Sequence, residues 1–256
     1  MAYFERRSDS SFLATDHVGG AWDTATQHIA PALGLMAHVI ETDRDRRRDD
    51  GLVIGRLSYD ILGTVPVELV ETDVRVLRPG RTIELVEATM RHGGREIVRL
   101  RAWLMQPRDT AELEGTHLPP IPSPDEMPPW DGTSVWPGGF IESTEARRIE
   151  HEPGRASYWV RTKLPLVADE EASRLSRTVG LLDIANGMAV RANPREVMFP
   201  NLDLTAHFFG EPRGDWVGFD TTVSFGVNGI GLTSSVIHDV DGPIATTNQI
   251  LTVRPL

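Results

Sequence analysis

The order of helices and strands that this sequence predicts occurs twice, once on each side of a proline-rich segment. The segment, residues 110–137, holds seven prolines with acidic residues between them, a composition that predicts an extended linker on the surface. On each side of it, one helix is followed by four or more antiparallel strands. This repetition predicts a duplicated α+β unit, with halves at residues 1–109 and 138–256 whose sheets join into one.

Alternating apolar and polar residues place the strands in both halves. In the first half, a helix with Ile29, Leu33, Met36 and Ile40 on one face comes first. Strands are then expected at residues 52–59, 70–76, 83–89 and 98–104. In the second half, a strand at 156–162 precedes the helix, and further strands are expected at residues 202–209, 216–223, 230–238 and 244–253.

A carboxylate interrupts the apolar helix that the second half predicts at residues 175–188. Three further residues share the face of Asp183: Gly180, Asn186 and Gly187. A buried carboxylate is costly unless it is paired or used. Asp183 therefore indicates either an ion pair, for which Arg177 and Arg191 are available, or a working acid at the wall of a cleft, where small neighbours leave room for a ligand.

Composition and motifs exclude several classes of function. A net charge of −11 argues against a non-specific nucleic-acid binder, and the absence of cysteine rules out disulfides, thiolate nucleophiles and cysteine-bound metals. The eight histidines are scattered, so no metal site is expected, and no cofactor is required. Gly-x-Ser-x-Gly and Walker motifs are absent. The remaining carboxylate, amide and hydroxyl groups fit water-mediated hydrolysis or a lyase step better than redox work.

The chain shows no export signal and no apolar stretch long enough to span a bilayer. We therefore expect a cytoplasmic protein without a membrane span. Assembly into a homo-oligomer is also expected, because sheets of this kind expose edges that can pair.

Several strings, taken in order and spacing, resemble the double hotdog acyl-CoA thioesterases. They lie at residues 182–187 (LDIANG), 199–208 (FPNLDLTAHF), 214–216 (GDW), 239–245 (DVDGPIA) and 248–251 (NQIL), with 74–88 (VRVLRPGRTIELVEA) in the first half. The resemblance covers nearly the whole chain. It implies an α+β double hotdog fold, in which two long helices are each wrapped by a curled antiparallel sheet and the sheets join across the duplication.

The resemblance also implies a site. In type II thioesterases of this architecture, an Asp on the second-half helix, a Gln on the last strand and a hydroxyl residue on an intervening strand bind the attacking water. Asp183 and Gln249 match the first two positions, and the third falls at Asn201, where a Thr is usual. The residues expected to contact the substrate are Gly180, Asn186, Gly187 and Met188.

The first half departs from the family at the start of its helix. Relatives often carry His-Gly-Gly there, whereas this chain reads His28-Ile29-Ala30, so a working pocket is not expected in that half. His28 itself is expected to cap or pack the helix. The acyl chain is expected in an apolar tunnel lined by Leu182, Met188 and Phe208. Surface arginines available to the CoA phosphates are Arg174, Arg177 and Arg213.

Three functions compete on these grounds. The first is hydrolysis of an acyl thioester, carried by CoA or an acyl carrier, through water activated by Asp183 and Gln249. The second is a non-catalytic acyl-CoA-binding protein, which the departures at Asn201 and His28 favour. The third is a hotdog dehydratase or hydratase. Such an enzyme needs a histidine beside its carboxylate, and none accompanies Asp183 in the sequence, so this function ranks last.

Overall fold

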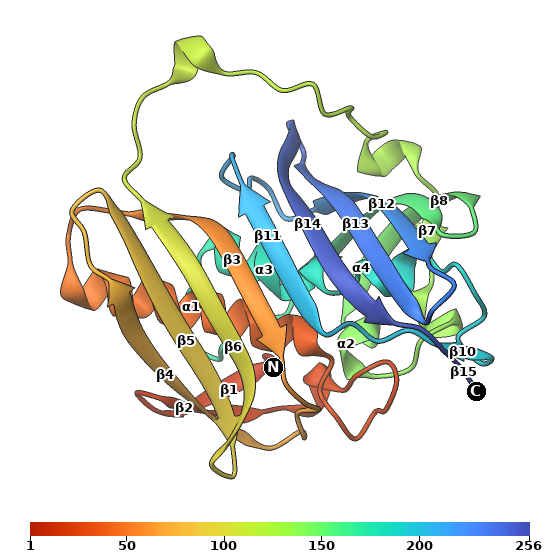
Figure 1. Ribbon diagram of the computed structural model, residues 1–256, viewed down its shortest axis with the longest axis horizontal. Helices are drawn as coiled ribbons and strands as arrows, with labels where there is room; N and C mark the ends of the chain where they lie inside the picture. Colours follow the sequence, from red (N-terminus) through yellow and green to blue (C-terminus); the bar gives the residue numbers. More distant parts are fainter.

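A single antiparallel sheet of 13 strands runs through the computed structural model, which describes residues 1–256 (Figure 1). Its strand order is β1-β2-β4-β5-β6-β3-β11-β14-β13-β12-β9-β8-β7. The first six strands are β1 (Phe4–Ser8), β2 (Ser11–Ala14), β3 (Val53–Ile61), β4 (Leu69–Arg78), β5 (Ile83–His92) and β6 (Arg95–Met105). The others are β7 (Pro129–Trp130), β8 (Thr144–Glu152), β9 (Arg155–Thr162), β11 (Asp203–Phe208), β12 (Val217–Phe225), β13 (Ile230–Asp239) and β14 (Gly242–Thr252).

The two halves join where β3 pairs with β11 in the middle of the sheet. Tyr59 lies opposite Leu204 in this pairing, and both side chains point into the core. A short second sheet pairs β10 (Val197–Met198) with β15 (Arg254–Pro255). The α+β class and a sheet shared by the two halves are therefore as the sequence predicts.

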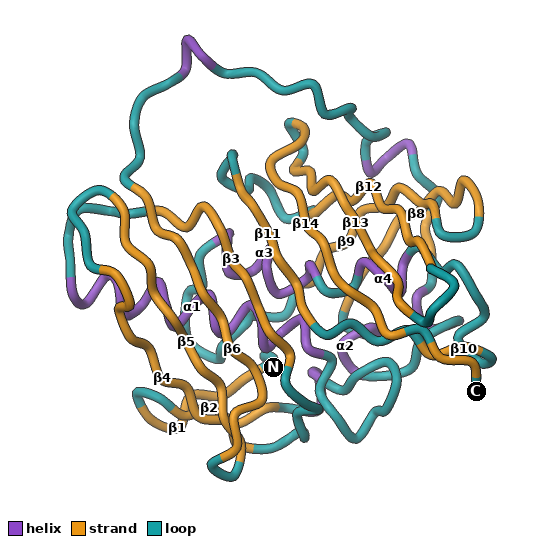
Figure 2. Tube along the Cα trace, viewed as in Figure 1, coloured by secondary structure: helices purple, strands orange, loops and turns teal.

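Helices α1 (Ile29–Arg47) and α3 (Arg174–Leu182) lie against each other on one face of the sheet (Figures 1 and 2). Glycines allow their close approach, because a Cβ on Gly34 would lie 2.8 Å from the Cα of Gly180. The only other α-helices are the single turns α2 (Gly139–Glu142) and α4 (Ala185–Met188). No helix is both long enough and apolar enough to cross a membrane.

The expectation of two long helices is wrong for the second half. There α3 has nine residues and ends at Leu182, whereas α1 has 19. After Leu182 the backbone tightens, since the N–H of Ile184 bonds to the carbonyl of Leu181 three residues back instead of four. The predicted helix at residues 175–188 is therefore two helices, with Asp183 in the turn between them.

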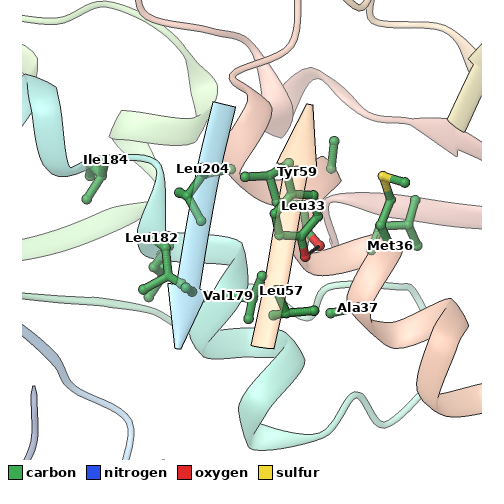
Figure 3. Close-up of a cluster of buried hydrophobic side chains, with 14 of the residues drawn as sticks. Leu33, Met36, Ala37, Leu57, Tyr59, Val179, Leu182, Ile184 and Leu204 are labelled. Atoms are coloured by element: carbon green, nitrogen blue, oxygen red, sulfur yellow. Dashed lines mark hydrogen bonds between the residues drawn. The ribbon is translucent and has the colours of Figure 1, made fainter. Parts of the chain in front are cut away.

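The core is continuous across the duplication, as the close-up in Figure 3 shows. Leu33 of α1, Val179 and Leu182 of α3, and Leu57 and Leu204 of the joined strands belong to one buried cluster. The hydroxyl of Tyr59, which is labelled in this close-up, donates a hydrogen bond to the carbonyl of Leu33 over 2.9 Å. The packing that fixes α1 and α3 on the sheet therefore depends on both halves.

The proline-rich segment leaves the end of β6 as an arch and returns to the second half at β7 (Figure 1). Short 3-10 turns at Ala111–Leu113, Pro124–Glu126 and Gly132–Ser134 are its only helices before α2. The indole N–H of Trp159 donates to the carbonyl of Pro122, and that of Trp136 donates to Gly187 of α4, each over 2.8 Å. The first contact holds the middle of the segment against β9, and the second brings its end to α4, directly after the turn that holds Asp183.

Candidate functional site

Asp183 is the C-cap residue that directly follows α3, and its side chain points away from solvent. Only 5% of the residue is exposed. Its Oδ1 accepts hydrogen bonds from Nε2 of Gln249 over 2.8 Å and from Nδ2 of Asn201 over 2.6 Å. Gln249 lies on the inward face of β14, and Asn201 forms an isolated bridge with Leu251 just before β11. The fold therefore brings together three residues that are far apart in the sequence.

The second carboxylate oxygen of Asp183 has no hydrogen-bond partner within the protein. It lies 4.0 Å from Nδ1 of His28, at the start of α1 in the other half. Asp183 and His28 both line a cavity of about 400 Å³, with Asn186, Gly187 and Asn201 also in its wall. One oxygen of the carboxylate is thus fixed by two amides, while the other faces the space where a ligand can bind.

Burial dominates the electrostatics of this pair. It raises the pKa of Asp183 from 3.8 to about 7, although the hydrogen bonds from Asn201 and Gln249 act in the opposite direction. Burial also lowers the pKa of His28 from 6.5 to about 3. Near neutral pH the site therefore combines an uncharged imidazole with a carboxyl that readily gains or loses a proton.

The sequence did not predict that His28 lies next to Asp183. Its Nδ1 accepts a hydrogen bond from the N–H of Ala30 over 3.2 Å, so it caps α1 as expected. The same ring lies beside Asp183, so the fold supplies this carboxylate with a histidine neighbour that the sequence around it lacks. The sequence feature that could have indicated this position is that His28 directly precedes the first residue of α1. In this duplicated fold the start of α1 faces Asp183 in the second half.

An ion pair does not account for Asp183. Arg177 pairs with the exposed Asp215 over 3.1 Å, and Arg191 reaches only the carbonyl of Pro153. No arginine or lysine lies within salt-bridge distance of Asp183. The buried carboxylate is held by neutral amides, which supports the cleft-acid interpretation of the sequence.

The four residues expected to contact the substrate divide into two pairs. Asn186 and Gly187 line the cavity, and Nδ2 of Asn186 also donates to the carbonyl of Phe199 over 3.3 Å. Gly180 lies outside this cavity, against α1, and Met188 is buried away from it. Gly180 shares the helical spacing of Asp183, but this part of α3 lies against Gly34 of α1 and lines a separate cavity.

The residues expected to line an acyl tunnel or to contact the CoA phosphates also lie outside the Asp183 cavity. Leu182 is part of the core shown in Figure 3, and neither it nor Phe208 lines the Asp183 cavity. Arg174 and Arg177 line a separate cavity of about 430 Å³ along α3, and Arg213 pairs with Asp241 over 3.1 Å. The arginine at the Asp183 cavity is Arg254 of β15.

Aromatic residues from irregular segments close one side of the cavity. Trp22 and Trp136 meet edge to face with ring centroids 4.9 Å apart, and Trp22 is partly exposed. Ile29, Ile61 and Val65 add apolar surface. A pocket with apolar walls and a few directed polar groups is the usual form of a site for a small organic ligand.

The sequence matches one family over both halves. Residues 18–105 match the acyl-CoA thioesterase N-terminal domain, and residues 117–253 match the acyl-CoA thioesterase C-terminal domain. The chain belongs to the acyl-CoA thioesterase family. No curated protein matches it.

Solved structures with the same fold have low sequence identity to this chain. A candidate thioesterase from Novosphingobium aromaticivorans has a TM-score of 0.76 at 20% identity, covering 99% of each chain. A hot dog fold protein from Alicyclobacillus acidocaldarius has a TM-score of 0.77 at 13% identity, covering 98% of this chain and 95% of its own. An acyl-CoA thioesterase II from Mycobacterium marinum has a TM-score of 0.69 at 16% identity, with 99% and 95% covered. These likenesses establish a hotdog fold.

Proposed function

We propose that this protein hydrolyses an acyl thioester, carried by CoA or an acyl carrier, by direct attack of water. The observation that carries the proposal is the asymmetric environment of Asp183. Two amides fix Oδ1, and Oδ2 faces a cavity whose walls are largely apolar. A general base needs this combination of fixed orientation and a free oxygen. Membership of the acyl-CoA thioesterase family supports the same reaction.

In the proposed reaction, Oδ2 of Asp183 takes a proton from water as the water oxygen bonds to the thioester carbon. The tetrahedral intermediate then breaks its carbon–sulfur bond, and the thiolate takes the proton that Asp183 accepted, which releases a free thiol and a carboxylic acid and restores the carboxylate. A carboxylate with a pKa of about 7 is a stronger base than an ordinary aspartate, yet much of it is ionised near neutral pH.

The oxyanion of the intermediate needs a hydrogen-bond donor. The N–H of Ile29 lies in the first turn of α1, where backbone donors have no acceptor within the helix, and Ile29 lines the cavity. The positive end of a 19-residue helix dipole adds to this stabilisation. In this scheme the first half provides the electrophilic side of the site and the second half provides the base.

The test is thiol release from a panel of acyl-CoAs by the wild-type protein and by Asp183→Asn. The carboxamide keeps the shape of the side chain and cannot take the proton, so we expect kcat/KM to fall by about 100- to 10,000-fold. Asp215→Asn is the control, because Asp215 is a surface residue that also belongs to the second half. Tight acyl-CoA binding without thiol release by the wild type would indicate a binding protein instead.

A second candidate reaction is reversible hydration of a 2-enoyl thioester, which the 4.0 Å approach of His28 to Asp183 favours. Neutral His28 would remove the C2 proton of a 3-hydroxyacyl thioester, and protonated Asp183 would give its proton to the departing hydroxyl, releasing water. The raised pKa of Asp183, about 7, keeps part of this carboxyl protonated near neutral pH, as the acid of such a pair requires.

The variant His28→Asn separates the two reactions. Asparagine is a good N-cap residue, so it preserves the end of α1 while removing the imidazole. If the protein is a hydrolase, we expect thiol release to fall by less than about tenfold, because the base is Asp183. If it is a hydratase, the absorbance of the conjugated enoyl thioester changes with the wild-type protein and stops changing with His28→Asn.

A further inference from the structure

Arg254 of β15 lines the cavity of Asp183, and its guanidinium has no anionic partner in the protein. Of all the residues in the cavity wall, Arg254 is the only arginine or lysine. No carboxylate lies within salt-bridge distance of it, although Arg177 and Arg213 of the same half each pair with an aspartate. Because Arg254 is exposed, water solvates its unpaired charge, and the guanidinium remains free to meet a ligand.

Backbone pairing fixes the place of Arg254 relative to the proposed base. Asn201, which donates to Asp183 over 2.6 Å, forms a bridge with Leu251. Three residues further along the chain, Arg254 pairs with Met198 in the short sheet of β10 and β15 (Figure 1). At the usual rise of a strand, the backbone of Arg254 therefore lies about 10 Å from the end of the cavity that holds Asp183.

The other ionisable side chains of the cavity supply no positive charge. Burial lowers the pKa of His28 to about 3, so its imidazole is uncharged near neutral pH. Asp183 is either neutral or negative, and the whole chain carries a net charge of −11. The only cationic partner for an anionic group on a bound acyl chain is therefore the guanidinium of Arg254.

We propose that Arg254 binds a carboxylate at the far end of the acyl group, so that the preferred substrates are thioesters of dicarboxylic acids. The planar guanidinium presents pairs of N–H donors that match the two oxygens of a carboxylate. A plain alkyl chain leaves the guanidinium without a partner. This inference rests on the proposed function for one point, the place of the thioester carbon beside Asp183.

The length of the ligand decides between an acyl carboxylate and a phosphate of the carrier. In an extended six-carbon diacid, the free carboxylate lies about 6 Å from the thioester carbon, given ordinary bond lengths. The N–H groups of the arginine then lie about 3 Å beyond it. The nearest phosphate of CoA, or of the same arm on a carrier protein, lies about 16 Å from the sulfur when the pantetheine arm is extended. The spacing of Asp183 and Arg254 therefore fits the diacid.

The experiment compares binding of two CoA thioethers that cannot be hydrolysed, S-hexyl-CoA and S-(5-carboxypentyl)-CoA, by titration calorimetry. We expect the wild-type protein to bind the carboxylated thioether about three- to tenfold more tightly, the size of effect typical of an exposed ion pair with good geometry. Arg254→Gln should lose this preference, and Arg254→Glu should favour S-(6-aminohexyl)-CoA over the carboxylated thioether. Equal or weaker binding of the carboxylated thioether by the wild-type protein would overturn the inference.

Two controls test whether the effect belongs to Arg254 and to the acyl carboxylate. Arg195→Gln removes another exposed arginine near β10 that lies outside the cavity, so it should keep the preference of the wild type. The same two thioethers of pantetheine carry no phosphate, and the preference for the carboxylated one should persist on them. Arg254→Gln might instead weaken both CoA thioethers equally and neither pantetheine thioether. That result would assign Arg254 to a phosphate and overturn the inference.

Thiol release from hexanoyl-CoA and adipoyl-CoA separates this inference from the proposed function. Hydrolysis of both substrates with no preference, together with equal thioether binding, refutes the dicarboxylic class and leaves the hydrolase intact. No thiol release from either, with the binding preference present, refutes the hydrolase and leaves Arg254 as the residue that selects a carboxylated ligand.

Discussion

The side-chain amide of Gln249 donates to Oδ1 of Asp183 over 2.8 Å and links the last long strand of the sheet to the turn after α3. Asn201 supplies a second amide to the same oxygen. A buried carboxylate with two neutral donors and no cation is oriented without being fully charge-stabilised. This explains why the pKa of Asp183 remains raised despite its hydrogen bonds.

Replacing Gln249 by Leu removes one donor to the carboxylate. The hydrogen bond from Gln249 lowers the pKa of Asp183, so its loss should raise that pKa further. We expect the pH profile of kcat/KM for thiol release to shift to higher pH, with a loss of about tenfold or more near neutral pH. An unchanged pH profile in a folded Gln249→Leu protein would show that this amide does not affect the pKa of the catalytic base.

Asn201 allows a comparison of two replacements. The hydroxyl of Asn201→Thr can still donate to Asp183, whereas Asn201→Ala cannot. We therefore expect Asn201→Thr to keep kcat/KM within about tenfold of the wild type and Asn201→Ala to lose more, with a higher apparent pKa. Steady-state thiol release between pH 5 and 9 measures both. Equal activity of the two variants would assign Asn201 a purely structural part.

Asp183 should also make stability depend on pH. Its pKa is about 7 in the folded protein and 3.8 as an ordinary value, so the folded state holds the proton more tightly. Its contribution to the free energy of unfolding is complete below about pH 4 and is lost as the pH rises through 7. Relative to Asp183→Asn, which stays neutral, the wild type should lose about 2–4 kcal/mol between pH 4 and 8.

Urea unfolding of the wild type and Asp183→Asn at several pH values measures this difference. Asp215→Asn provides the baseline, because a surface carboxylate should give a nearly constant difference over the same range. A difference between wild type and Asp183→Asn that does not change with pH would mean that Asp183 ionises like a solvated aspartate.

The contact between α1 and α3 predicts that alanine is harmful at one glycine and tolerated at the other. A Cβ on Gly34 would meet the Cα of Gly180 and the carbonyl of Ser176 at 2.8 Å, so Gly34→Ala should destabilise the protein by about 1–3 kcal/mol. A Cβ on Gly180 would meet nothing closer than 3.8 Å, so Gly180→Ala should keep both stability and activity. Chemical denaturation and thiol release check both. A large loss of activity in Gly180→Ala would restore the substrate contact that the sequence suggested.

Regular elements with strong patterns were the part of the fold that the sequence predicted well. The four first-half strands and α1 follow from apolar alternation and helical spacing, and the structure has them at the expected places. β8 was missed because its sequence, TEARRIEHE, is mostly charged, as befits a strand near the edge of the sheet. β1 was missed as well, since Arg6 and Arg7 hide its alternation.

A site residue could be predicted when it is unusual among its sequence neighbours. A residue whose role depends on contacts between distant parts of the chain could not. Asp183 is conspicuous as a charge among apolar residues. His28 is unremarkable in sequence and gains its meaning only because α1 begins opposite the turn after α3.

The most direct measurement of the central claim is the pH dependence of kcat/KM for thiol release, from pH 5 to 9, in the wild type and in Asp183→Asn. We predict that wild-type activity rises with pH to a plateau with a midpoint near 7, the pKa of Asp183, and that the variant shows a flat profile at least about 100-fold lower. A variant that retains the wild-type rate, or the same rising profile, would contradict Asp183 as the group that activates water.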